Sequence, residues 1–164
     1  MLEDTRILKP AIRTRFLSHG TLGSRDIKKS RRFYEEFLGL ETTQTSPVSL
    51  MIRLGGEHVY AVVQVKKKSE MPRYYHNGID VETPEEVDKA YEIVLSANEE
   101  WGVRDATRPV EQHGTYSFHF WDLDDNCWEI LSNPPKGYTW IFDQGDLDGK
   151  GHFEKGFQHN RPDL

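Results

Sequence analysis

Two histidines and one glutamate, far apart in the chain, have the types and settings of metal ligands. His19 and His76 each stand in a run of β-forming residues that precedes a helical pattern, and Glu129 stands in the last such run. Side chains two residues apart share one face of a strand, so Glu129 lies between Cys127 and Leu131. A carboxylate in so apolar a strand needs a cation or hydrogen-bond donors to offset the loss of its hydration.

Two imidazoles and one carboxylate form a donor set that holds a divalent metal and leaves coordination positions open. This 2-His-1-carboxylate set is typical of non-haem Fe(II), with Mn(II) or another divalent ion as the alternative. We therefore expect His19, His76 and Glu129 to bind one metal ion where the fold brings their three strands together.

The segments that carry these residues fall in two similar halves of the chain. Each half begins with a strand, continues with an amphipathic helix and ends with a β-hairpin. The order β-α-β-β-β therefore occurs twice, and we predict an α+β fold of two βαβββ modules, about 14–66 and 72–132. Their strands are expected to form an open, barrel-shaped mixed sheet with the helices outside. Because the module repeats, His19 and His76 occupy equivalent positions.

The ends of both helices are marked by residues with capping chemistry. Ser24 is placed to cap a first helix over about 25–38, and Gly39 is placed to end it in a left-handed conformation. In the second half, Thr83 and Glu86 have the spacing of a capping box. These signals fix where each helix meets the strand that carries a candidate ligand.

Composition limits the partners and the compartment. The chain has 164 residues, a net charge of −6 and a pI near 5.6, which argue against nucleic-acid binding because that requires a clustered basic face. No apolar run approaches the roughly 20 residues that span a bilayer, and the N-terminus lacks the pattern of a signal peptide. Cys127 is the only cysteine, which excludes an internal disulfide and fits a reducing compartment. A cytoplasmic protein with a small-molecule substrate is expected.

Three stretches resemble sequence patterns of the vicinal oxygen chelate superfamily, which groups glyoxalases, bleomycin-resistance proteins and extradiol dioxygenases. They are HGTLGSRDIKKSRRFYEEFLGLE, HNGIDVETPEEVDKAY and FWDLDDNCWEIL. The resemblance covers about 14–132 and implies a glyoxalase-like fold of paired modules. Two departures from the family pattern, Leu123 for the usual proline and Asp125 for the usual glycine, alter the turn of the last hairpin.

The arrangement of three ligands resembles the extradiol dioxygenase branch, in which Fe(II) binds both hydroxyls of a catechol and also O2. This resemblance implies ring cleavage of a catechol-like small molecule with O2. Glyoxalase-type and epimerase-type members generally use a fourth protein ligand, for which Gln64 is the one candidate. The alternatives are a metal-dependent epimerase, isomerase or lyase, and a non-catalytic small-molecule binder of the drug-resistance kind.

The extradiol interpretation also requires a group that moves protons. His58 lies where dioxygenases carry a strand histidine. His113 resembles the histidine of an R-H-G stretch with which some dioxygenases hydrogen-bond substrate or oxygen. His119 stands ten residues before Glu129, where dioxygenases have a tyrosine.

Whether His119 reaches the site depends on the length of the last hairpin loop. A five-residue loop, 122–126, places His119 opposite Glu129 on the same face. A four-residue loop would bring Phe120 to that position and turn His119 outward.

The last segment, 133–164, lacks sustained periodicity but is rich in aromatic rings. Its five large rings are Tyr138, Trp140, Phe142, Phe153 and Phe157. Disordered segments are normally poor in aromatics. We therefore expect this C-terminal tail to pack over the edge of the barrel or across a homodimer interface, near the substrate entrance.

Overall fold

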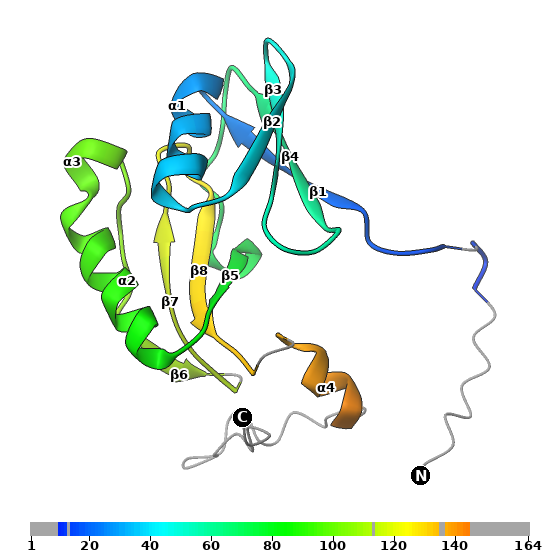
Figure 1. The fold of residues 1–164 in the computed structure, drawn as a ribbon. Coiled ribbons are helices and arrows are strands. Elements are labelled where there is room, and N and C mark those ends of the chain that lie inside the picture. Colours follow the sequence, from blue (N-terminus) through cyan, green and yellow to red (C-terminus); the bar gives the residue numbers. More distant parts are fainter. Residues whose placement is uncertain (1–9, 13, 113, 135–136, 145–164) are drawn as a thin grey trace.

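The chain folds into two modules of the same construction, each with one four-stranded sheet (Figure 1). The computed structural model describes residues 10–12, 14–112, 114–134 and 137–144. The N-terminal module contains β1 (His19–Ser24), α1 (Ile27–Arg32), the π-helical turn η1 (Phe33–Phe37), β2 (Glu41–Ser46), β3 (Ser49–Arg53) and β4 (Val59–Gln64). No helix among the described residues is long and apolar enough to cross a membrane.

The C-terminal module repeats this order, with one extra helical turn before its first strand and one after its main helix. Its elements are the 3-10 turn η2 (Arg73–Tyr75), β5 (Asn77–Val81), α2 (Pro84–Ser96), α3 (Asn98–Trp101), β6 (Val110–Gln112), β7 (Thr115–Trp121) and β8 (Cys127–Ser132). The short helix α4 (Thr139–Gln144) follows the last strand.

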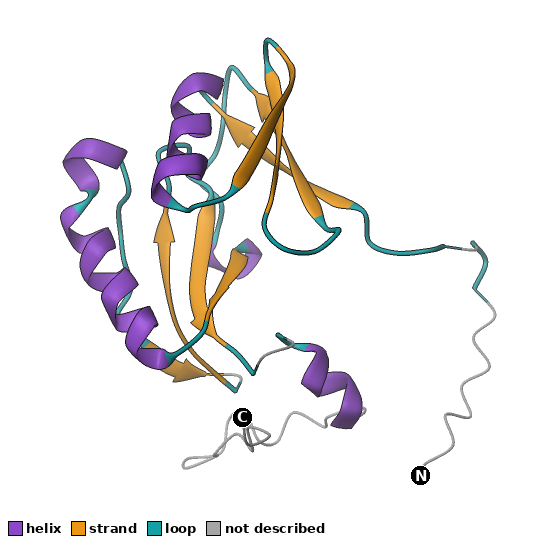
Figure 2. Ribbon diagram, in the orientation of Figure 1, coloured by secondary structure: helices purple, strands orange, loops and turns teal. Residues whose placement is uncertain are grey.

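The two sheets have the same topology. Their strand orders are β1-β4-β3-β2 and β5-β8-β7-β6, and in each sheet the first and last strands of the module pair in parallel while the other pairs are antiparallel. The helices lie on the outside (Figure 2). The α+β fold of two βαβββ modules is therefore confirmed. The sheets remain separate and do not close into a barrel, because each is completed by its own module's hydrogen bonds.

The helix ends agree with the sequence except at the start of α1. Thr83 and Glu86 form the expected capping box at α2, and Gly39 is left-handed with φ +69°. The prediction that Ser24 caps α1 is wrong: Asp26 caps it, accepting from the N–H groups of the first turn. Ser24 instead completes β1, where its buried hydroxyl contacts that of Ser30.

Each sheet buries one face beneath its module's helices, and these faces join in a common core. The strand residues in this core are Leu22, Leu50, Ile52, Val62, Phe118, Phe120, Trp128 and Ile130. Because side chains alternate along a strand, the residues between them point to the opposite, helix-free face of each sheet. The candidate metal ligands lie at these alternate positions.

A buried carboxylate organises the turn between β7 and β8. Asp122 is 1% exposed and accepts hydrogen bonds from the backbone N–H groups of Asp124 and Asn126, at 2.8 and 2.9 Å, and from the Trp128 indole N–H at 2.9 Å. Burial raises the pKa of Asp122 to about 6, although the hydrogen bonds from Trp128 and Asn126 oppose that rise. The turn therefore contains five residues, with Trp121 paired to Cys127.

The same turn joins the two modules. The Asp124 carboxylate accepts hydrogen bonds from the backbone N–H of Arg25 and from the hydroxyl of Ser30, both in the N-terminal module. Asp125, left-handed at φ 60°, forms ion pairs with Arg25 and Arg104. The glycine usual at this position is thus replaced by a residue that uses its side chain to hold the junction.

We predict that Asp122→Asn lowers the free energy of unfolding by about 2–4 kcal/mol, because an amide group would face N–H donors with a donor of its own. Chemical denaturation of the metal-free chain measures the loss. Glu57→Gln, which changes an exposed carboxylate in the same way, is the control. Equal stability of the two variants would contradict the organising role of Asp122.

Candidate metal centre

The helix-free face of the C-terminal sheet is unusually polar for a buried surface. Glu129 and His119 are only 4% and 5% exposed, and Ser117 on the same face of β7 is fully buried. Asp80, on the adjoining strand β5, adds an exposed carboxylate at the edge of this face. The N-terminal sheet has no comparable group of buried charges on its corresponding face within the described residues.

Three side chains on this face converge to form a compact donor group. The ligand atoms of His76, His119 and Glu129 all lie within 4.8 Å of one another, the one arrangement of this kind among the described histidines, cysteines and acids. Nε2 of His76 is 3.1 Å from one Glu129 oxygen, and Nε2 of His119 is 3.7 Å from the other. The imidazole rings lie edge to face with centroids 4.6 Å apart.

The strand register explains why His119 faces Glu129. The five-residue turn pairs the two residues directly across β7 and β8, so their side chains leave the sheet on the same face. This confirms the five-residue alternative for the loop, and the four-residue alternative is wrong. Phe120 accordingly points to the core, where it is fully buried.

His76 is held in an orientation that directs Nε2 toward Glu129. It directly precedes β5, and its Nδ1 lies 2.6 Å from the carbonyl oxygen of Arg73. Because a carbonyl only accepts, Nδ1 must carry the proton of this hydrogen bond. In the neutral ring, Nε2 would then present a lone pair to a carboxylate oxygen, so a second proton or a cation must lie between them.

The protonation states are consistent with this requirement. The hydrogen bond to Glu129 raises the pKa of His76 despite partial burial. Burial alone would raise the pKa of Glu129, but hydrogen bonds from His76 and Ser117 outweigh it and lower that pKa. Burial lowers the pKa of His119 to about 4, so its ring is neutral at pH 7. The group thus offers one carboxylate and two imidazoles, and these residues fit a divalent cation.

His19 does not join this group within one chain. It is the exposed first residue of β1, and its Nδ1 contacts the Ser18 hydroxyl at 2.6 Å. The parallel registers support its equivalence with His76, since Leu22 pairs with Val62 just as Ile79 pairs with Ile130. The structure therefore places the two repeated histidines on separate sheets.

The N-terminal sheet lacks the other donors. By the same register, Ala61 stands where the C-terminal sheet has Glu129, and Met51, its partner across β3 and β4, stands where that sheet has His119. The helix-free face around His19 therefore offers no second strong ligand at the equivalent positions. A metal at His19 requires donors from another sheet.

The remaining candidate residues lie apart from the donor group or outside the described residues. His58 is exposed beside Tyr60, with ring centroids 5.1 Å apart. Gln64 donates to the backbone oxygen of Arg25 at 3.2 Å, which accounts for it structurally. His113 lies outside the described residues.

Two further side chains lie near the donor group, and sequence reasoning assigned neither of them to the site. Asp80 accepts a hydrogen bond from the backbone N–H of Asn133 at 3.2 Å, and burial raises its pKa. Tyr138, 38% exposed, lies near Thr115, and burial raises its pKa, with the charges of Glu129 and Asp80 adding to the rise. Strand alternation puts Asp80 on the same face as Gly78, and Tyr138 is one of the tail rings that the sequence predicts to pack near the substrate entrance.

The aromatic tail is only partly described. Tyr138 begins its return toward the sheet, while Phe142 on α4 is 84% exposed within the single chain. The side chain of Trp140 and the residues Phe153 and Phe157 lie outside the described structure.

Comparison with known proteins agrees with this architecture. The family model described as the Glyoxalase/Bleomycin resistance protein/Dioxygenase superfamily matches residues 16–130. No curated protein matches the sequence.

Solved structures from several bacteria share the fold. A fosfomycin resistance protein from Listeria monocytogenes superposes with a TM-score of 0.59 at 22% identity, covering 76% of this chain and 98% of its own. A glyoxalase/dioxygenase from Nostoc punctiforme superposes with a TM-score of 0.58 at 21% identity, covering 73% of this chain and 92% of its own. A possible glyoxalase from Bacillus cereus superposes with a TM-score of 0.58 at 20% identity, covering 72% of this chain and 99% of its own. At these identities the likeness is one of fold.

We predict that Mn(II) affinity rises with pH between about pH 6 and 8, because the metal must displace the proton that the raised pKa of His76 retains. In the metal-free chain, the contact between His76 and Glu129 contributes stability that is fully present below the ordinary imidazole pKa. That stability is lost as the pH rises through the raised pKa of His76.

Titration calorimetry in two buffers of different ionisation enthalpy measures the protons released on Mn(II) binding. About one proton per metal is expected near neutral pH. Glu92→Gln, on the exposed face of α2, should leave this release unchanged. A pH-independent affinity in the wild-type chain would contradict the role of His76.

Proposed function

The chain belongs to the Glyoxalase/Bleomycin resistance protein/Dioxygenase superfamily, and we propose that it is an Fe(II)-dependent enzyme that cleaves a catechol-like ring with O2. The observation that carries this proposal is the convergence of two candidate metal ligands, His76 and Glu129, with the buried imidazole of His119 beside them. A 2-His-1-carboxylate set is the one that non-haem Fe(II) oxygenases use.

Each residue of the polar face has a part in this chemistry. His76 and Glu129 hold the metal, and the Arg73 carbonyl keeps the His76 ring in the orientation that binding needs. A bound Fe(II) would supply open coordination positions for the two oxygens of the substrate and for O2. A catechol supplies the electrons that O2 accepts, so the reaction needs no separate reductant.

His119 is suited to move a substrate proton. Its buried ring is neutral at pH 7 and can accept a proton from a hydroxyl beside the metal. The adjacent Glu129 carboxylate would stabilise the imidazolium that results. Gln112 donates to the Ser117 hydroxyl at 3.2 Å, which orients that hydroxyl beside Glu129.

A second copy of the chain supplies the third ligand in this proposal. His19 is exposed on a sheet face where the described residues offer no second metal ligand, and the two sheets of one chain do not close around a common centre. Packing the N-terminal sheet of one copy against the C-terminal sheet of another would bring His19 to His76 and Glu129. His58, which precedes the strand paired with His19, would arrive with it as a further proton carrier.

A second candidate function is a metal-dependent isomerase, epimerase or lyase of the glyoxalase type. The structural likeness to a fosfomycin resistance protein and to a possible glyoxalase favours it. Such an enzyme needs the same donor group but consumes no O2. Oxygen uptake therefore separates the two candidates.

We predict that the chain, reconstituted anaerobically with Fe(II), consumes O2 when given a member of a catechol panel. Glu129→Gln should lower both bound iron and oxygen uptake by at least roughly tenfold, because one anionic ligand is lost. The matched control, Glu92→Gln, should retain both. Stoichiometric iron without oxygen uptake on any catechol would favour the isomerase candidate, and absence of bound metal would contradict both.

We further predict that mixing two inactive variants, His19→Ala and Glu129→Ala, restores activity. When dimers form at random, half are mixed, and each mixed dimer has one intact site, so about a quarter of the sites recover. Metal content and oxygen uptake of the mixture measure this recovery. If His119 rather than a second copy's His19 completes the site, His19→Ala alone keeps its metal and His119→Ala loses it.

A further inference from the structure

Arg73 is a cation without a partner at the edge of the candidate metal centre. It begins η2, a turn whose side chains are all exposed, and its carbonyl oxygen rather than its side chain holds Nδ1 of His76. Among the described residues, its guanidinium group has no hydrogen bond and no ion pair. The side chain is therefore free to bind a group that the rest of the described chain does not supply.

The charge of Arg73 acts on the donor group. Burial is the main cause of the low pKa of His119, and the charge of Arg73 lowers that pKa further. Burial raises the pKa of the Cys127 thiol, and the charge of Arg73 opposes this rise. Coulomb interactions weaken with distance. Together with the place of Arg73 one turn before His76, these effects put the guanidinium group beside the donor group.

The acids at this end of the polar face are engaged with other groups. Glu70 forms an ion pair with Arg104 at 2.7 Å. Asp122 is buried, and N–H donors surround it. Glu129 is a ligand of the proposed metal, and a divalent ion bound there would add positive charge of its own. Arg73 thus adds to a positive potential at this end of the face.

The opposite end of the polar face is acidic. Asp80 lies four residues beyond His76 along β5, and the backbone N–H of Asn133 donates to its carboxylate at 3.2 Å. An anionic substituent on a substrate would be repelled at that end and attracted at the end with Arg73. The face therefore has a direction along which a charged substrate would lie.

A second copy packed over this face would not neutralise Arg73. The four strands of the N-terminal sheet contain a single acid, Glu41. Its carboxylate pairs with Arg53 on the neighbouring strand at 2.7 Å. The sheet that would bring His19 to the metal therefore leaves the charge of Arg73 available to a substrate.

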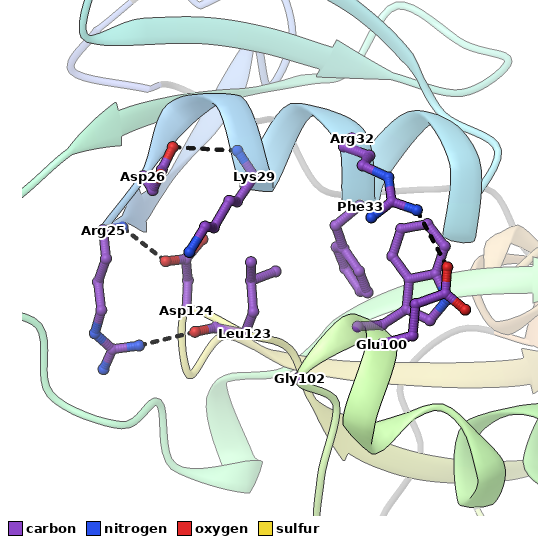
Figure 3. A pocket seen from close by; sticks show the side chains of 10 residues that line it. Arg25, Asp26, Lys29, Arg32, Phe33, Glu100, Gly102, Leu123 and Asp124 are labelled. Atoms are coloured by element: carbon purple, nitrogen blue, oxygen red, sulfur yellow. Dashed lines mark hydrogen bonds and ion pairs between the residues drawn. The ribbon is translucent and has the colours of Figure 1, made fainter.

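The cavity at the junction of the modules is balanced where Arg73 is not (Figure 3). It has a volume of about 430 Å³ and lies between α1, α3 and the β7–β8 turn. The charged residues that line it are three cations and three acids: Arg25, Lys29 and Arg32 with Asp26, Glu100 and Asp124. Equal numbers of opposite charges leave no net charge for a ligand to match.

We infer that the substrate of the proposed enzyme carries an anionic substituent, such as a carboxylate, and that Arg73 binds it. This inference rests on the proposed function, because it names the substrate class of the same site. The catechol oxygens would lie at the metal, and the substituent would extend toward η2. A guanidinium group binds a carboxylate through two parallel N–H donors, so Arg73 would orient the ring as well as strengthen its binding.

Anaerobic titration calorimetry of the full-length, Mn(II)-loaded chain tests this inference with two probes. They are 3-(3,4-dihydroxyphenyl)propionate and the corresponding propanamide, which has the same catechol and no charge. The acid should bind roughly tenfold more tightly than the amide, and Arg73→Gln should reduce this ratio to less than about twofold. Arg73→Lys should give an intermediate ratio, because it keeps the charge but not the planar fork.

Arg31→Gln, which removes a guanidinium group from the helical side of the chain, should keep the preference of the wild-type chain for the acid. Mn(II) affinity, measured first, should be similar in all of these chains, since the carbonyl oxygen of residue 73 remains in each. A chain that binds no Mn(II) would contradict the proposed function and this inference with it. When Mn(II) is bound, failure of both probes to bind, equal affinities for acid and amide, or a preference unchanged by Arg73→Gln would overturn the role of Arg73 alone.

Discussion

The buried carboxylate of Asp122 is the interaction on which the rest of the structure depends. Removing a carboxylate from water is costly unless donors surround it, and here two backbone N–H groups and the Trp128 indole provide them. Satisfying those donors leaves only one length for the turn between β7 and β8. The register that results puts His119 across from Glu129, so one charge with its donors determines which side chains face one another several residues away.

The same turn carries the contact between modules. Asp124 and Asp125 lie in the same turn as Asp122, and their side chains contact Arg25 and Ser30 in the other half of the chain. Asp124 matches the family pattern, whereas the glycine that the pattern has in place of Asp125 would offer no carboxylate. One of the two departures, Asp125, thus ties the geometry of the turn to the N-terminal module through its ion pair with Arg25.

The repeat, the α+β class and the faces of the strands follow from sequence because they depend on local periodicity and capping chemistry. The helix start at Asp26 does not, since Ser24 and Asp26 are both capping residues and only the sheet hydrogen bonds of Ser24 decide between them. The separation of His19 from His76 likewise cannot be predicted from the sequence pattern. Each sheet is formed only by strands of its own module. The sequence therefore predicts the position of a candidate ligand within its sheet, but not which sheet packs against it.

The two modules share a framework but divide its uses. At equivalent register positions the N-terminal sheet has Ala61 and Met51 where the C-terminal sheet has Glu129 and His119. Burying charge on both sheets would incur desolvation twice, whereas one uncharged and one charged face are complementary in a way that two charged faces are not. The exposed, uncharged face that carries His19 is therefore suited to pack against a charged face such as the one around Glu129 and His119.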